Sequence, residues 1–224
     1  MSAVNLLLLS WGFGAVAGFV AETAGRPIAE ATIGYLGDAT IPYPGDAPWA
    51  DVERDRLAAT GARVVPVSAA DQDRTTFAAS LDGLDAIYVA GGNTFALLWA
   101  LRRDGGADEL LTRVQAGLPY IGCSAGSVIT GPSITPVEVL DDPAESPGPV
   151  DPAGLGLIDT VPIPHADGKL PPHPPEMFEQ VRQRYGSSHD LTFIGDDQAI
   201  RVDAAGTITI VGSGDRAGDD GDTD

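Results

Sequence analysis

The sequence predicts an α/β fold: a mostly parallel sheet with helices on both faces and a C-terminal β-hairpin. Short apolar runs alternate with segments of helical character, which is typical of a parallel sheet covered on both sides. Glycines and polar residues directly follow several of these runs, where open α/β sheets place their ligands. With 224 residues and 43% hydrophobic content, the chain can form one continuous core. We expect a single domain over residues 1–211.

The first strand is predicted from the apolar run 5–9, which precedes a glycine-containing loop and the start of a helix. An export signal is the alternative for this apolar start, but such signals begin with basic residues and the first cation here is Arg26. Further strands of the parallel sheet are expected at 32–36, 62–67, 86–89 and 120–122. Helices with glycines near their ends are expected between them, at 49–60, 74–81, 94–103 and 107–116.

Beyond residue 130, prolines interrupt any long periodic element, so the chain is expected to be looped there. A strand at 160–163, a helix at 176–185 and a strand at 191–194 should follow. The last two strands, 199–202 and 207–211, flank Ala204-Ala205-Gly206, and this pattern predicts the hairpin. Residues 212–224 are mostly glycine and aspartate and predict an acidic, disordered tail.

The charge balance excludes several classes of partner. The net charge is −19, from 32 acidic and 13 basic residues, whereas a nucleic-acid-binding surface needs clustered cations. We expect no nucleic-acid partner and no membrane partner, and one cysteine fits a cytoplasmic location. The acidic excess has two interpretations. One is a high-salt cytoplasm, where a Debye length of about 3 Å at molar salt screens self-repulsion; the other is an ordinary acidic protein.

A nucleophile elbow is predicted at residues 122–126, Gly-Cys-Ser-Ala-Gly, between an apolar strand and a helical continuation. The central residue of such a turn occupies a strained corner, and the flanking glycines allow other backbone to approach closely. Ser124 is at the centre, and the only cysteine, Cys123, comes one position before it. We therefore expect Ser124 to be the nucleophile.

A second glycine motif, Gly91-Gly92-Asn93-Thr94-Phe95, follows the strand at 86–89 and opens a helix. Backbone N–H groups freed by the two glycines, together with the helix N-terminus, can bind an oxyanion. Asn93 and Thr94 are candidates for substrate contacts. The alternative is a structural glycine turn in which Asn93 or Thr94 caps the helix.

Three histidines limit the choice of a general base. His165 directly follows a predicted strand, whereas His173 lies in a proline-rich loop and His189 in a polar connection. We expect His165 to be the base.

A carboxylate should orient this imidazole. Asp196 and Asp197 follow a strand and are suitably placed, although a charged turn between two strands is the interpretation that the sequence alone favours. The alternatives are Asp141, Asp142 and Asp167.

Four motifs in order resemble peptidase E, the aspartyl dipeptidase group within the class I glutamine amidotransferase-like fold. The first two are Gly91-Gly92-Asn93-Thr94-Phe95 and the run Tyr120-Ile121-Gly122-Cys123-Ser124-Ala125-Gly126, which precedes Gly131-Pro132-Ser133-Ile134. The last two are Gly154-Leu155-Gly156-Leu157-Ile158 before Pro164-His165, and Asp196-Asp197-Gln198-Ala199-Ile200. The resemblance covers most of the chain.

The resemblance implies a serine peptidase that removes an N-terminal aspartate from a small peptide substrate, a dipeptide, without a metal or an organic cofactor. It assigns Ser124 as nucleophile and His165 as base, and it places Asp196 where the family commonly has a glutamate. The oxyanion hole matches Gly91 and Gly92 together with the amide of Ala125.

Three points stay open within this resemblance. Aspartate is one methylene shorter than glutamate, so Asp197 remains an alternative to Asp196. A further acidic position of the family falls on Val139, with Glu138 and Asp141 nearby. The arginine expected to bind the aspartyl side chain matches no residue directly; the candidates are Arg182 and Arg184, which equally suit an ordinary surface.

Two other functions compete with the serine peptidase. One is an amidotransferase-like amidase that uses Cys123 as nucleophile. The other is a non-catalytic small-molecule binding protein that keeps the same fold.

Overall fold

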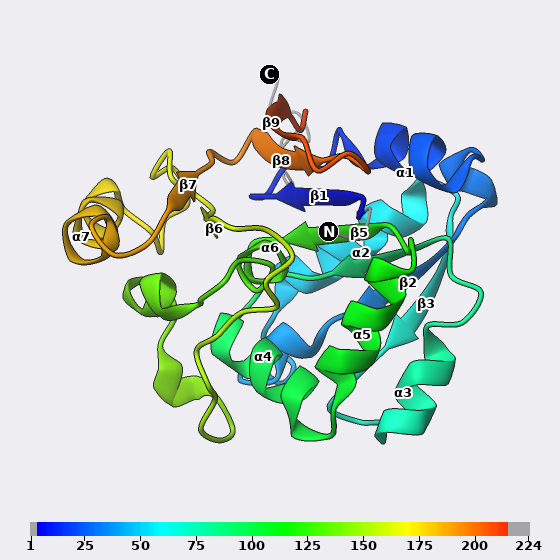
Figure 1. Ribbon diagram of the computed structural model, residues 1–224, viewed down its shortest axis with the longest axis horizontal. Helices are drawn as coiled ribbons and strands as arrows, with labels where there is room; N and C mark the ends of the chain where they lie inside the picture. Colours follow the sequence, from blue (N-terminus) through cyan, green and yellow to red (C-terminus); the bar gives the residue numbers. More distant parts are fainter. Residues whose placement is uncertain (1–3, 215–224) are drawn as a thin grey trace.

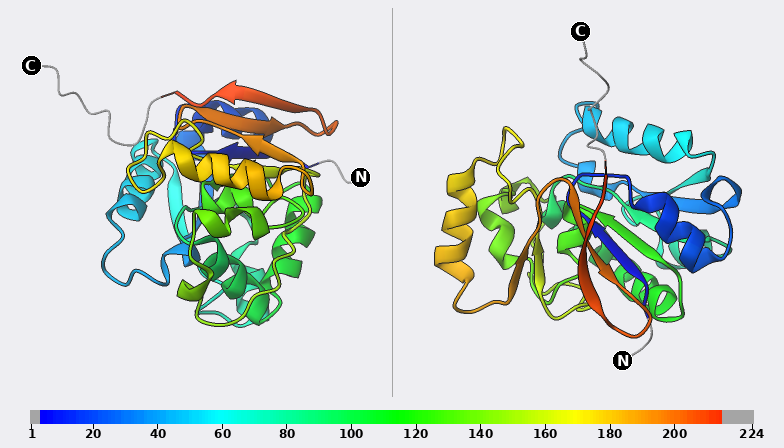
Figure 2. Two further views of the ribbon diagram at one scale, coloured as in Figure 1. Left: turned by 90° about the vertical axis from the view of Figure 1, so that its left-hand side faces the viewer. Right: turned by 90° about the horizontal axis from the view of Figure 1, so that it is seen from above.

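A seven-stranded sheet forms the centre of the molecule in a computed structural model that describes residues 4–214 (Figure 1). Its strands are β1 (Leu6–Leu9), β2 (Thr32–Leu36), β3 (Arg63–Val67), β4 (Ala86–Val89), β5 (Tyr120–Cys123), β8 (Gln198–Val202) and β9 (Ile208–Gly212). They lie in the order β3-β2-β4-β5-β1-β8-β9, and the first five are parallel. Because β8 and β9 are antiparallel, they confirm the predicted hairpin, which lies along one edge of the sheet (Figure 2).

Helices cover both faces of this sheet, as predicted. They are α1 (Val16–Ala24), α2 (Pro48–Ala59), α3 (Arg74–Ser80), α4 (Thr94–Arg103), α5 (Gly106–Gln115), α6 (Ala125–Val128) and α7 (Pro175–Tyr185). Side chains alternate along β1: Leu6 and Leu8 pack in the core shared with α3, α4 and α5, whereas Leu7 and Leu9 pack in the core shared with α1 and α2. All four are buried because β1 has a strand on each side and helices above and below.

Local sequence signals fix where several helices begin. The Asn93 carboxamide oxygen accepts hydrogen bonds from Phe95 N and Ala96 N and so caps α4. In the same way Asp73 caps α3 by accepting from Thr76 N, and a proline occupies the first position of α2. The helices expected between residues 49 and 116 are found with shifts of at most one residue at their ends.

The strands expected at 160–163 and 191–194 form, but outside the central sheet. β6 (Val161–Ile163) and β7 (Leu191–Phe193) pair with each other as a separate two-stranded parallel sheet. Helix α7 connects them, and the three elements lie together to one side of the central sheet (Figure 1). Within this small unit, the segment after β6 and the segment after β7 both lie at the carboxyl ends of β1 and β5.

The folded part of the chain extends past the expected boundary at residue 211. Gly212 belongs to β9, and Ser213 is buried and donates its N–H to Asp197 O at 2.8 Å. The rest of the expected acidic tail lies outside the described residues. Between residues 4 and 214, no helix has the length and apolar character to cross a membrane.

Candidate active site

The segment Gly122-Cys123-Ser124-Ala125-Gly126 makes a sharp turn between β5 and α6. Ser124 has φ 47° and ψ −110°, a conformation that residues other than glycine seldom adopt, so the backbone is strained there. Both flanking glycines are required by close approach: a Cβ at Gly122 would lie 2.5 Å from Gly126 O, and one at Gly126 would lie 2.1 Å from Val89 O. The turn therefore has the geometry of a nucleophile elbow.

A series of hydrogen bonds runs from this serine into the protein. Ser124 Oγ lies 2.9 Å from His165 Nε2, and His165 Nδ1 lies 2.7 Å from Asp196 Oδ1. The imidazole and the carboxylate are both almost completely buried. When Asp196 accepts a hydrogen bond from Nδ1–H, Nε2 presents its lone pair to the serine hydroxyl, as a general base must.

Ser10 supports this arrangement from the end of β1. Its hydroxyl donates to Asp196 Oδ1 at 3.1 Å and accepts from His165 N at 2.7 Å, and the residue is fully buried. His165 also has a positive φ of 61°. Ser10 thus fixes both the carboxylate and the backbone of the histidine.

The structure distinguishes among the carboxylates that the sequence left open. Asp197 is exposed and Asp167 pairs with Lys169 Nζ at 3.1 Å. The side chain of Asp142 accepts from Ala144 N. Of the five candidates, Asp196 is the one that contacts the His165 ring.

Cys123 points away from the serine. It is completely buried in the core shared with α1 and α2, with Sγ 3.6 Å from Ser10 O. Burial, aided by the nearby Glu53 carboxyl, raises the pKa of the thiol well above its usual range. A thiol that stays protonated in a closed core is a poor nucleophile.

The glycine loop after β4 lies against the elbow. A Cβ at Gly91 would lie 3.2 Å from Ser124 Cβ, closer than an ordinary van der Waals contact, so glycine fits here without displacing the serine. The Gly91 N–H donates to Glu53 Oε2 at 3.3 Å. Within residues 4–214, the amides of Gly92 and Ala125 have no such acceptor. Of the three amides expected to form an oxyanion hole, two therefore remain available.

Ser124 opens into a cavity of about 500 Å³, a size usual for small-molecule sites. Its walls combine aromatic rings, loop residues and three carboxylates. The lining residues are Trp11, Tyr43, Trp49, Gly91, Gly92, Ser124, Leu140, Asp141, Asp142, Glu145, His165, Leu170, Pro172 and His173.

His173 stacks on the catalytic candidate His165, with ring centroids 5.3 Å apart. Burial first, and the neighbouring His165 second, lower its pKa to about 4. His173 is therefore neutral at neutral pH and adds no positive charge beside the base.

Asn93 and Thr94 hold the carboxylates of this cavity in place. Asn93 Nδ2 donates to Glu145 Oε2 at 3.0 Å, and Thr94 donates from N at 2.9 Å and from Oγ1 at 2.5 Å to Asp141 Oδ2. Tyr43 Oη also donates to Glu145 Oε2 at 2.5 Å. The structural alternative given for Asn93, a helix cap, is also present, since its Oδ1 accepts from Phe95 N and Ala96 N at the start of α4.

Arg182 and Arg184 do not line the cavity. The Arg182 guanidinium lies over the Phe193 ring, 3.5 Å from its centroid, and Arg184 forms an ion pair with Glu138 at 2.7 Å. Both lie on α7, in the unit set to one side of the central sheet (Figure 1).

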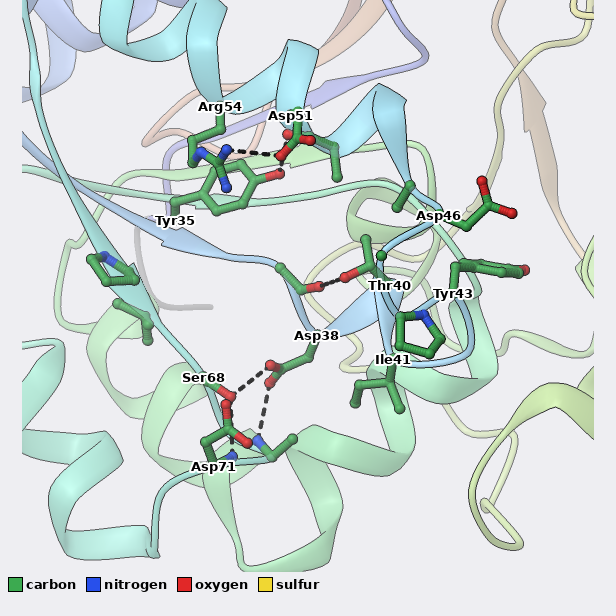
Figure 3. Close-up of a pocket in the computed structure, with 18 of the residues that line it drawn as sticks. Tyr35, Asp38, Thr40, Ile41, Tyr43, Asp46, Asp51, Arg54, Ser68 and Asp71 are labelled. Atoms are coloured by element: carbon green, nitrogen blue, oxygen red, sulfur yellow. Dashed lines mark hydrogen bonds and ion pairs between the residues drawn. The ribbon is translucent and has the colours of Figure 1, made fainter.

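A second hollow of about 650 Å³ lies beyond the ends of β2 and β3 (Figure 3). Two of its aspartates make local contacts: Asp38 accepts from Ser68 Oγ and Ala69 N, and Asp51 pairs with Arg54. Tyr43 lines both hollows, but Ser124 and His165 do not line this one. The chemistry described above therefore belongs to the smaller cavity.

Sequence reasoning missed Ser10 and Glu53. Ser10 directly follows the first strand, so the same strand-end rule that selected His165 could have found it. Glu53 lies in a helix among charged residues, where nothing in the sequence distinguishes a buried glutamate from exposed ones.

A serine hydroxyl on a strand-to-helix turn, in series with an imidazole and a carboxylate, defines the class of α/β serine hydrolases. The model of peptidase family S51 matches residues 24–210. The chain belongs to this family of serine peptidases.

Individual relatives agree with the family. An uncharacterized peptidase of Listeria innocua is 32% identical over 170 residues, which cover 74% of this chain and 78% of that protein. Peptidase E of Streptomyces coelicolor is 35% identical over 119 residues, which cover 52% of this chain and 47% of that protein. The match to that enzyme thus spans about half of each chain.

Solved structures share the whole fold. A crystal structure of a candidate peptidase E protein from Listeria monocytogenes matches with a TM-score of 0.77 and 25% identity, covering 93% of this chain and 98% of that chain. A peptidase from an acI-B1 Actinobacterium matches with a TM-score of 0.68 at 17% identity, covering 95% and 89%. The predicted peptidase E-like α/β fold is confirmed.

Proposed function

We propose that this serine peptidase hydrolyses dipeptides and other short peptides with a free amino end, through an acyl-enzyme formed on Ser124. The observation that carries the proposal is the series Ser124–His165–Asp196, with contacts of 2.9 and 2.7 Å, opening into a cavity of about 500 Å³. A cavity of this size favours a short substrate over a folded protein.

In the first half of the reaction, Ser124 Oγ bonds to the carbonyl carbon of the scissile peptide as its proton passes to His165 Nε2. The carbonyl oxygen becomes negative, and the Gly92 and Ala125 amides are the donors proposed to bind it. The C–N bond then breaks, and the leaving amine takes the proton from Nε2. Asp196 stabilises the imidazolium between these two transfers.

In the second half, water attacks the acyl carbon while His165 Nε2 takes its proton. The C–Oγ bond breaks, the proton returns to Ser124 Oγ, and the carboxylic product leaves. With the substrate, this water and the chain's own groups, both steps balance.

The charges of the cavity bear on the choice of substrate. Its three carboxylates, Asp141, Asp142 and Glu145, attract the α-ammonium group of a peptide, and the described lining residues include neither lysine nor arginine. An N-terminal aspartate, implied by the resemblance to peptidase E, would bring a further negative side chain to this surface. We therefore expect neutral or basic first residues to be better substrates than aspartate.

A dipeptide panel tests both levels of the proposal. The wild type and Ser124→Ala should each be assayed on Ala-Ala, Lys-Ala and Asp-Ala. A fourth substrate, N-acetylated Ala-Ala, lacks the ammonium group. Turnover that persists in Ser124→Ala would refute the mechanism. A preference for Asp-Ala would instead support the aspartyl specificity that the resemblance implies. Equal cleavage of acetylated and free Ala-Ala would refute the binding of the ammonium group.

The alternative with Cys123 as nucleophile is tested by iodoacetamide. Because the thiol is buried and protonated, we expect neither labelling of the native protein nor loss of activity. Stoichiometric labelling with loss of activity would instead favour the thiol.

A further inference from the structure

Glu53 is a buried carboxyl next to the elbow that the proposed mechanism does not use. The residue lies on α2 and is 3% exposed. Its Oε2 accepts from Gly91 N at 3.3 Å, whereas Oε1 is buried without a hydrogen-bond partner among the described residues. Glutamates are rarely buried to this extent because removing a carboxyl from water is costly unless its oxygens are satisfied. Burying the Glu53 carboxyl therefore lowers the stability of the folded protein.

The contact with Gly91 connects Glu53 to the reacting serine. Built onto Gly91, a Cβ would lie 3.1 Å from Glu53 Oε1 and 3.2 Å from Ser124 Cβ, so this glycine is packed between the two side chains. Its N–H is directed at Glu53 and away from the cavity. The orientation of the Gly91 peptide in turn sets the next amide, that of Gly92, which lines the cavity.

Among residues 4–214, the groups that act on the Glu53 carboxyl carry no positive charge. Tyr35 on β2, Tyr88 on β4 and Cys123 on β5 face it, while its neighbour Arg54 is exposed and pairs with Asp51. Burial raises the pKa of the Glu53 carboxyl to about 7, against the opposing effects of the Gly91 amide, the thiol and the Tyr88 hydroxyl. The ionised and neutral forms are thus both populated near neutral pH.

We propose that Glu53 is a positioning residue: its carboxyl oxygen holds the Gly91 N–H and so fixes the Gly91-Gly92 loop where the Gly92 amide meets the oxyanion at Ser124. The catalytic part of this inference rests on the proposed peptidase function, but the contact between Glu53 and Gly91 does not. What the loop needs from residue 53 is an acceptor oxygen rather than a charge. Glutamine should therefore replace glutamate, and leucine should not.

Two neutral variants of similar size separate these possibilities. Glu53→Gln keeps an acceptor and should retain kcat within about threefold, whereas Glu53→Leu removes it and should lower kcat about tenfold, with KM unchanged in both. Leucine at this site leaves no buried carboxyl to desolvate, so the unfolding midpoint of Glu53→Leu should match or exceed that of the wild type at pH 8. Equal kcat values in folded Gln and Leu variants would overturn the positioning role.

A second measurement needs neither the leucine variant nor any substrate. In uniformly 15N-labelled protein, the assigned Gly91 amide proton should titrate with a midpoint near pH 7 in the wild type and should not do so in Glu53→Gln. A Gly91 signal that does not respond to pH in the wild type, or that titrates identically in the variant, would overturn the contact. If the wild type cleaves no peptide, the peptidase proposal fails, yet this titration still decides whether Glu53 holds Gly91.

Discussion

Replacing Asp196 with asparagine is the most direct test of the hydrogen-bonded series. The substitution keeps size and an acceptor oxygen but removes the negative charge 2.7 Å from His165 Nδ1. At that separation and an effective dielectric constant of about 20, an opposite charge stabilises an imidazolium by about 6 kcal/mol. This corresponds to about four orders of magnitude in rate. The amide dipole retains part of the effect, so we expect kcat to fall about 10³- to 10⁴-fold.

Asp197→Asn provides a matched control. This neighbouring aspartate is exposed, so the same chemical change should alter kcat by less than about twofold. Both variants should be assayed on the best dipeptide of the panel, with single-turnover measurements to separate acylation from substrate binding. A loss of less than tenfold in Asp196→Asn, or similar losses in the two variants, would refute the assignment of Asp196.

Four further outcomes follow from the structure. Ser10→Ala should lower kcat about tenfold and stability by about 1–3 kcal/mol, because its hydroxyl bridges Asp196 and His165 N; unchanged kinetics would contradict this. Gly92→Ala should destabilise by more than about 2 kcal/mol, since φ is 138° and a Cβ would lie 2.5 Å from Ala39 O, whereas Gly83→Ala, at φ 74° with open space, should cost only about 1 kcal/mol in urea unfolding. Because the pKa of His173 is lowered to about 4 in the folded protein, the unfolded state binds one more proton than the folded state between pH 6.5 and 4. As the pH falls through this window, the free energy of unfolding of the wild type should decrease by up to about 3 kcal/mol relative to that of His173→Phe. Parallel stability curves for the two proteins would argue against a buried neutral imidazole. With a net charge of −19, the unfolding midpoint should rise between dilute buffer and molar KCl, and a flat response would favour an ordinary acidic protein over one adapted to high salt.

Most of the central fold could be predicted because its signals are local. The run 5–9 contains β1 (Leu6–Leu9), whose four residues are all buried, and the helix expected at 94–103 has those limits as α4 (Thr94–Arg103). The placement of β6 and β7 could not be predicted, since their short apolar runs look like those of the central strands. Which strand pairs with which depends on contacts between segments far apart in the chain.

The elbow could be located from its glycines, because Gly122 and Gly126 meet backbone at distances that exclude a side chain. Choosing Asp196 over Asp197 was beyond the sequence: adjacent residues in an extended or turning segment point in different directions, and only the folded chain shows which one meets His165. The arginines on α7 illustrate the same limit, since their contacts with Phe193 and Glu138 come from segments distant in sequence.

The sequence by itself determined the class of fold, the strained serine turn and the acidic character, because each depends on residue type and spacing along the chain. The tertiary structure alone decided which carboxylate meets His165, that Ser10 bridges the two, and that Glu53 on α2 reaches Gly91 in the loop after β4. The physical reason is that hydrogen bonds act over about 3 Å, and such distances between remote residues exist only once the sheet and its covering segments have packed together.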